Sequence, residues 1–192
     1  RQRKLLSDKG GNNCDVLLMS ATPIPRTLTM SVYGDMDVSI IKEKPSNRKE
    51  VKTYSKLENK IDDVLNFVKK EIKEGNQVFW VCPLIEESKK LDHQSSVNKY
   101  KFLEKLFPKK VALLHGKVDN DEKEKILNKF LKKEYSILVS TTIIEVGIDF
   151  PNANVIIIEN ANKFGLSQLH QLRGRVGRGT KQASCILMFK SN

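Results

Sequence analysis

Apolar residues follow two patterns that alternate along the chain: short continuous runs, and longer stretches in which apolar positions recur every three or four residues. A continuous run predicts a strand buried on both faces of a parallel sheet, and the helical spacing predicts an amphipathic helix. The runs predicted as strands are Asp15–Ser20, Met36–Glu43, Gln77–Cys82, Val111–Leu114, Ser136–Thr141, Asn154–Glu159 and Ser184–Phe189.

The helical spacing falls between these runs. It predicts helices over Pro25–Tyr33, from Ile61 to Gly75, around Lys99–Phe107 after a polar stretch Glu86–Asn98, within His115–Lys133, and after a capping Ser167. The positions expected to face inward are Ile61, Val64, Leu65, Val68 and Ile72, then Ile126, Leu127, Phe130 and Leu131, and finally Leu169 and Leu172.

Strands that alternate with helices predict an α/β domain, with a doubly wound, mostly parallel sheet and helices on both faces. Ligands of such sheets bind beyond the carboxyl ends of the strands, and we expect the loops that carry functional residues to lie there. The polar segment Lys44–Glu50 interrupts the pattern and is predicted to be a linker, which separates Asp15–Ser20 from the other strands.

Composition narrows the class of protein. Hydrophobic residues make up 39% and charged residues 30%, which is ordinary for a globular protein, and no apolar run is long enough to cross a bilayer. The three cysteines lie far apart without metal-binding spacing, so an intracellular location and no metal site are expected. The net charge of +11 favours a polyanionic partner, but lysines and glutamates on solvated helix faces account for most of it.

Three loops combine polar and small residues. Ser20, Ala21 and Thr22 lie at the end of the first predicted strand, and taken alone a capped, rigid helix start explains this loop better than a function does. His115 and Gly116 end a strand and could let backbone N–H groups approach a phosphate, but an isolated His–Gly pair is more often only a turn. The third loop contains Thr141, Thr142, Gly147 and Asp149. The two hydroxyls suit contact with a nucleic-acid backbone, and a glycine and a carboxylate follow them. A functional loop and a purely structural apolar turn explain this pattern equally well.

The segment "QLRGRVGRG", Gln171–Gly179, carries the strongest signal. Seven of the 34 basic residues are arginine, and three of these seven, Arg173, Arg175 and Arg178, fall within six positions. A lysine would serve a nucleic-acid backbone patch equally well, whereas a guanidinium binds phosphate in two places at once. The choice of arginine therefore favours a directed phosphate contact such as an arginine finger, with Arg175 and Arg178 on one anion if the helix continues through them.

Together these motifs resemble the later motifs of superfamily 2 helicases. "SAT" resembles the third motif, "TTIIEVGID" the fifth and "QLRGRVGR" the sixth, and within the superfamily "ATPIPRTL", "WVCPLIEES" and "FGLSQLHQLRGRVGRG" look like the RecG family of bacterial DNA helicases. The transcription-repair coupling factor Mfd is the nearest alternative. The sequence contains no G-x-x-x-x-G-K-[ST] loop, and the resemblance implies that a first RecA-like domain, of which residues 1–47 are the tail, supplies it. Residues 48–192 would then be the second RecA-like motor domain.

The resemblance also implies roles for individual residues. Arg178 matches the arginine finger and Arg175 its companion. Gln171, Gly147 and Asp149 match positions near the nucleotide. The expected DNA contacts are His115, Gly116, Thr141 and Thr142, and the residues expected to couple the two sites are Ser20, Ala21 and Thr22.

For the full-length protein, the resemblance implies an ATP-driven translocase that remodels replication forks and Holliday junctions in recombination and repair. Its cofactors would be ATP and Mg²⁺, held mainly by the first motor domain, and its partner would be branched double-stranded DNA. A cytoplasmic, nucleoid-associated monomer is expected, and the 192 residues alone should not hydrolyse ATP. Two alternatives remain: a non-catalytic nucleic-acid-binding module, and a stand-alone nucleotide-binding domain. The missing phosphate-binding loop argues against the second.

Overall fold

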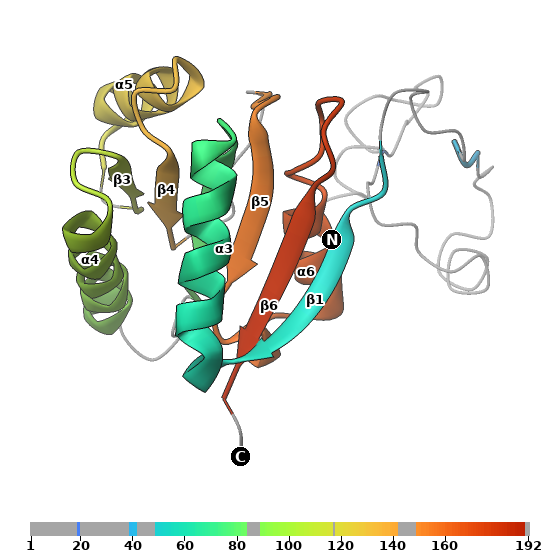
Figure 1. Ribbon diagram of the computed structural model, residues 1–192, viewed down its shortest axis with the longest axis horizontal. Helices are drawn as coiled ribbons and strands as arrows, with labels where there is room; N and C mark the ends of the chain where they lie inside the picture. The colour runs from blue at the N-terminus through green and yellow to red at the C-terminus, as the bar shows by residue number, and fades with distance from the viewer. Residues whose placement is uncertain are drawn as a thin grey trace, which may run out of the picture. The chain divides into compact units, whose positions relative to one another are not determined.

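The computed structural model describes residues 19, 39–41, 49–83, 89–116, 118–141 and 149–190, with side chains from residue 95 onward in the segment 89–116 (Figure 1). The chain divides into two units, Arg1–Lys42 and Glu43–Asn192. All helices and strands described below belong to the second unit. The predicted domain boundary after residue 47 stays a prediction, and the predicted strand Asp15–Ser20 and helix Pro25–Tyr33 lie outside the described residues, except for Met19.

Six parallel strands form one sheet in the order β1-β6-β5-β2-β4-β3. The strands are β1 (Lys52–Leu57), β2 (Gln77–Val81), β3 (Val111–Leu114), β4 (Ile137–Ser140), β5 (Ala153–Ile158) and β6 (Ser184–Phe189). Every residue of β2, β4 and β5 is buried, as continuous apolar runs in a covered parallel sheet require. The doubly wound α/β fold predicted from the sequence is therefore confirmed.

In the described part of the chain, four α-helices cover the two faces of the sheet: α3 (Ile61–Lys73), α4 (Lys89–Leu106), α5 (Asn120–Leu131) and α6 (Leu166–Arg173). On one face α3 and α4 pack through Val64, Val68 and Leu103 against Trp80 and Ile157. On the other face α5 and α6 pack, through residues such as Phe130 and Leu172, against strand residues that point the opposite way, such as Phe79 and Ile156. Figure 1 shows α3 in front of the sheet and α6 behind it. Successive strand side chains thus fill two separate cores.

Helix α3 follows from its local sequence. Its first turn carries Asp62 and Asp63 and its last turn Lys70 and Lys73, which complements the helix dipole. Gly75 follows the helix with φ of +80°, a conformation that glycine adopts without strain. The predicted inward face and the stop at Gly75 are both confirmed.

Three predictions about local structure are wrong. Helix α4 begins at Lys89, inside the polar stretch Glu86–Asn98 that was predicted to precede the helix, because its apolar positions are too sparse to produce a clear period. Leu131 is 40% exposed rather than inward, since it lies on the side of α5 turned from the sheet. Ser39–Ile41 belong to no strand, because an apolar run becomes a strand only when a neighbour completes its backbone hydrogen bonds.

Strand β1 was not predicted. Five of its six residues are exposed, and among the strands that the structure describes it pairs only with β6, at one edge of the sheet (Figure 1). Its sequence "KTYSKL" has neither an apolar run nor the alternation of a half-buried strand. Lysines on an exposed edge strand oppose pairing with another chain, which explains why a strand at this place can be polar.

The chain reverses its direction of winding between β2 and β5, which are neighbours in the sheet. The connection after β2 leads to α4 on one face, and the connection after β5 leads to α6 on the other. The carboxyl ends of β2 and β5 therefore form the topological switch point of this sheet, the place where open α/β sheets bind ligands.

Candidate functional site

The arginine turn, residues 174–179, follows α6 and leads toward β6. Helix α6 begins after Gly165, whose N–H donates to Gln168 Oε1 (3.0 Å), so the helix starts before Ser167 and the predicted serine cap is wrong. The helix ends at Arg173, with Gly174 as its C-cap. The expectation that a continuing helix aligns Arg175 and Arg178 is therefore also wrong, because the chain leaves the helix before either residue.

Glycines dock the backbone of the arginine turn against the segment that leads into β5. Gly177 has φ of +74°, and its N–H donates to Ala153 O (3.4 Å). A Cβ at Gly179 would lie 2.5 Å from Pro151 O, closer than any real contact of this kind. Val176, between the arginines, is fully buried. The backbone of the turn is thus held against residues 151–153. We call this docked backbone the frame of the turn, and it fixes the positions from which the arginine side chains extend.

The same segment fixes Asp149. Its neighbour Phe150 is buried and packs with Phe79 and Phe130, at ring-centroid distances of 5.7 and 5.4 Å. This aromatic contact anchors the segment in the core, while the Asp149 side chain stays 60% exposed. Asp149 Oδ1 lies 3.7 Å from Arg178 Nη1, so two residues predicted as site residues from separate motifs meet in the structure.

Arg175 differs from Arg178 in its surroundings. Its Nε is buried and has no hydrogen-bond partner among the described residues. Burial lowers the pKa of the Arg175 guanidinium, and the positive charge of Arg178 lowers the pKa further. Two guanidinium groups therefore lie close enough to repel each other, and one of them has an unused donor. An anion placed beside them would relieve both penalties.

The arginine turn lies at the edge of the sheet opposite to the one predicted. Ala153 is the first residue of β5, and Gln77, the first residue of β2, donates its N–H to Asn152 O (2.7 Å). Asp149, Arg175 and Arg178 therefore belong to the amino edge of the strands. The expectation that all functional loops follow strand ends is wrong for them, because α6 runs antiparallel to the strands and carries the chain back across the sheet.

The residues predicted to contact DNA remain at the carboxyl edge. His115 and Gly116 directly follow β3, and Thr141 directly follows β4, which pairs with β3. Gly116 is exposed and His115 half-buried, whereas Thr141 is only 4% exposed and offers little of its hydroxyl to a partner. Gln171 lies half-buried on α6, and Arg173 Nη2 donates to His170 Nδ1 (3.3 Å) on the same helix.

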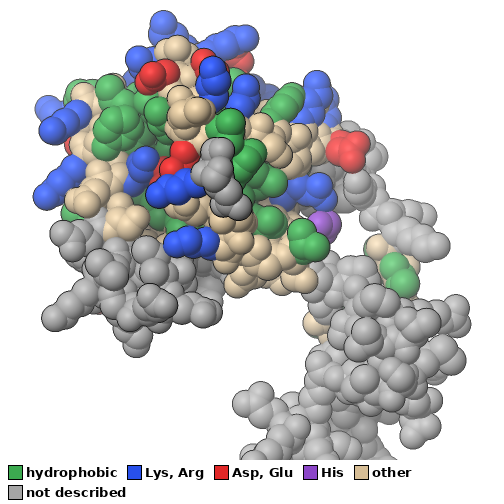
Figure 2. Space-filling model, turned by 90° about the horizontal axis from the view of Figure 1, so that it is seen from below, with side chains coloured by type: hydrophobic (Ala, Val, Ile, Leu, Met, Phe, Trp, Pro, Cys, Tyr) green, Lys and Arg blue, Asp and Glu red, His purple; other side chains and the backbone are tan. Residues whose placement is uncertain are grey.

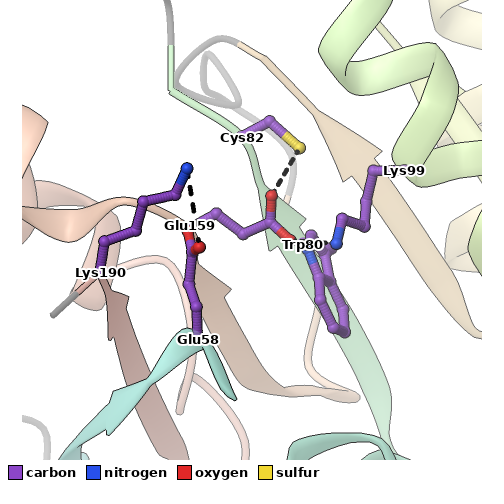
Figure 3. Close-up of polar contacts among 6 residues, drawn as sticks. All are labelled: Glu58, Trp80, Cys82, Lys99, Glu159 and Lys190. Carbon is purple, nitrogen blue, oxygen red and sulfur yellow. Dashed lines mark hydrogen bonds and ion pairs between the residues drawn. The ribbon is translucent and has the colours of Figure 1, made fainter. Parts of the chain in front are cut away.

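A cluster that the sequence analysis missed occupies the switch point, and we call it the switch-point cluster: Trp80, Cys82, Lys99 and Glu159 (Figure 3). The Glu159 carboxylate follows β5 and is almost buried. Trp80 Nε1 donates to its Oε1 (2.8 Å), Lys99 Nζ lies 2.7 Å from the same oxygen, and the Cys82 thiol reaches Oε2 at 3.8 Å. A glutamate that ends a wholly apolar run was the available signal, because a buried carboxylate requires partners.

The cluster is electrostatically complete. The ammonium of Lys99 lies 5.5 Å from the centroid of Trp80 and 5.3 Å from that of Phe102, so aromatic faces as well as Glu159 compensate its charge. Burial and the Glu159 carboxylate raise the pKa of the Cys82 thiol. These contacts join β2, β5 and α4 at the switch point.

Five predicted site residues lie outside the described residues: Ser20, Ala21, Thr22, Thr142 and Gly147. Among the described residues, no group of three or more His, Cys, Asp or Glu could hold a metal ion. Within the same part of the chain, no helix is long and apolar enough to cross a membrane. Figure 2 views the carboxyl edge and shows Lys and Arg side chains spread over that face rather than gathered in one patch.

Known proteins resemble this chain over nearly all of its length. It is 52% identical over 189 residues to the ATP-dependent DNA helicase RecG of Bacillus subtilis (strain 168), covering 97% of this chain and 28% of the relative. It is 55% identical to the protein of that name from Aquifex aeolicus (strain VF5), covering 97% and 24%. The chain thus spans about a quarter of the length of these curated relatives.

A solved structure described as RecG bound to a three-way DNA junction matches with a TM-score of 0.75 and 47% identity, over 91% of this chain and 23% of that one. The family model of the helicase conserved C-terminal domain matches residues 59–180, which include β2 to β5, the switch-point cluster and the whole arginine turn. The chain therefore belongs to the helicase conserved C-terminal domain family.

Proposed function

We propose that this chain is the second motor domain of a RecG-type, ATP-dependent DNA helicase and supplies its arginine finger. The arginine turn carries the proposal: a frame of glycine contacts fixes two neighbouring guanidiniums, one of which has a buried, unused donor. Close relatives are named ATP-dependent DNA helicases, which supports ATP as the source of the phosphate. The sequence contains no phosphate-binding loop, so ATP would be seated on another domain and would be approached by these arginines.

The residues of the arginine turn fit a polyphosphate. ATP supplies the phosphoryl group that hydrolysis transfers to water. Arg178, 35% exposed in its side chain, can reach across a domain interface, and Arg175 adds a second charge and the unused Nε donor. Such guanidiniums stabilise negative charge that develops during phosphoryl transfer. Gln171, Gly147 and Asp149 are proposed to lie near the nucleotide. Mg²⁺ would be held mainly by the first motor domain.

The carboxyl edge is proposed as the DNA side of the domain. His115 and Gly116 follow β3, and Thr141, whose side chain is buried, follows β4, so uncharged residues from neighbouring strands lie at this edge. Thr142 is proposed as a further DNA contact. A relative bound to a three-way DNA junction supports branched double-stranded DNA as the partner. Nucleotide and DNA would then meet opposite edges of one sheet, and Ser20, Ala21 and Thr22 would couple the two sites. Fork regression and branch migration are the activities proposed for the full-length protein, acting as a cytoplasmic, nucleoid-associated monomer.

The experiment that tests the finger is Arg178→Lys in the full-length protein. A lysine keeps the charge but loses the bidentate fork, so ATP binding should persist while hydrolysis falls by about 10³-fold or more. Steady-state ATPase rates and binding of a non-hydrolysable ATP analogue measure the two effects. Lys163→Arg, a change at an exposed lysine close to the start of α6, is the matched control. Near-normal hydrolysis by Arg178→Lys would refute the assignment.

A second test concerns the 192 residues alone. Without a phosphate-binding loop they should hydrolyse no ATP, whatever DNA is added. Robust hydrolysis by this chain would contradict the two-domain proposal.

A further inference from the structure

The contact between Asp149 and Arg178 is loose, although both groups are charged. At 3.7 Å, Oδ1 and Nη1 form an ion pair without a hydrogen bond, and the side chains are 60% and 35% exposed. Ion pairs of this kind contribute little to stability because water and salt screen them. The carboxylate therefore holds Arg178 weakly, and a stronger anion can replace it.

The backbones on both sides of this contact are firmly held. On the arginine side, Lys181 Nζ donates to Glu74 O (2.9 Å), and Gln182 Nε2 donates to Glu50 O (2.6 Å), just beyond the turn. On the aspartate side, Phe150 anchors the segment in the aromatic core. The structure thus combines a rigid frame with one exchangeable charge pair.

The local charge is not balanced by Asp149. The carboxylate pairs with Arg178, whose charge also acts on the neighbouring guanidinium of Arg175, and the buried Nε of Arg175 has no partner among the described residues. A net positive charge and an unused donor remain even while the ion pair exists. The turn therefore still attracts an anion, and a phosphate offers more charge and more acceptors than a carboxylate.

We propose that Asp149 is a positioning residue: Arg178 rests on its carboxylate and exchanges it for a phosphate of ATP. This inference rests on the proposed function and changes the role of Asp149 within it, from a ligand of the nucleotide to a competitor for the finger. The competition costs some binding affinity but holds Arg178 beside Asp149 when no nucleotide is bound.

The two roles of Asp149 make opposite predictions for ATP binding. If the carboxylate competes for Arg178, Asp149→Asn tightens binding of a fluorescent, non-hydrolysable ATP analogue to the full-length protein, with a Kd about two- to fivefold lower. If the carboxylate binds the nucleotide, the same variant weakens binding. Asp149→Glu, which keeps the charge, should restore a Kd close to that of the wild type. Asp62→Asn, at an exposed aspartate of α3, is the matched control and should leave the Kd unchanged.

A double-mutant cycle isolates the pathway through Arg178. In an Arg178→Ala background, Asp149→Asn should no longer change the Kd, because the Asp149 carboxylate then has no Arg178 guanidinium for which to compete with the nucleotide. A higher or unchanged Kd for Asp149→Asn alone, or an equal change in both backgrounds, would overturn the proposal. Failure of the proposed function looks different: Arg178→Ala would then hydrolyse ATP at a near-normal rate.

Discussion

Two ion pairs at opposite edges of the sheet differ in nearly every physical respect. Lys99 and Glu159 lie 2.7 Å apart, with side-chain exposures of 23% and 11%, and the carboxylate accepts further bonds from Trp80 and Cys82. Arg178 and Asp149 lie 3.7 Å apart, with exposures of 35% and 60%. The first pair is enclosed and has further hydrogen-bond partners, and the second is loose and open to solvent.

The difference indicates which pair builds the fold and which can act. A buried charge whose partners are all internal is costly to disturb, so the switch-point cluster fixes β2, β5 and α4 to one another. A guanidinium held weakly at the surface can change partners at small cost. Family membership alone does not distinguish these pairs, since the matched region contains both. Their geometry does, and the following changes test the distinction.

The largest effect on stability should come from the enclosed pair. Glu159→Ala leaves the Lys99 ammonium and the Trp80 N–H without their acceptor and should lower the free energy of unfolding by about 3–5 kcal/mol. Urea denaturation of the chain, followed by circular dichroism, measures the change. Glu58→Ala removes a pair with Lys190 of 3.9 Å whose lysine is 70% exposed, and should cost about 1 kcal/mol or less. Equal losses would show that enclosure does not matter.

The next effect concerns the frame of the arginine turn. Gly177→Ala forces a side chain into φ of +74° and places its Cβ 3.0 Å from that of Ala183, which should cost about 1–3 kcal/mol. The same denaturation assay applies. At Gly116 nothing lies within 4 Å of an added Cβ, so Gly116→Ala is the matched control and should change stability little. If Gly177→Ala is equally harmless, the backbone of the turn can adjust to a side chain at this position, and the frame is not rigid.

A pH titration of stability sharpens the contrast between enclosed and open groups. Burial raises the pKa of the Cys185 thiol from 9.0 to about 11, so the folded state favours the neutral thiol. Its contribution to stability is complete below pH 9 and should be lost progressively as pH rises from 9 toward 11. Cys185→Ala should lose less stability over this interval than the wild type. Parallel curves for the two proteins would contradict the burial of this thiol.

The smallest effect is expected at the open pair. Asp149→Asn should change the free energy of unfolding by less than about 0.5 kcal/mol, because an exposed ion pair of 3.7 Å contributes little. Together with a changed affinity for the ATP analogue, this result would show that the contact affects nucleotide binding and not stability. A loss comparable to that of Glu159→Ala would remove the distinction between the two pairs.

Much of the sheet was predictable because its strands are continuous apolar runs. Strand β1 was not, since a polar edge strand carries no such signal, and neither was the start of α4, whose apolar positions are sparse. The edge at which Arg175 and Arg178 lie could have been derived: a helix that follows a parallel strand returns to the amino edge. The pairing of Lys99 with Glu159 could not, because local spacing holds no information about contacts between distant segments.

The indole of Trp80 has a consequence for optical measurements. It is the single tryptophan of the 192 residues, it is fully buried, and it donates to one side of a charge pair whose other member lies over its ring. Emission from this chain therefore originates at the junction of β2, β5 and α4. Its wavelength and intensity would report the separation of two charges at that junction, without a label and without any change to the sequence.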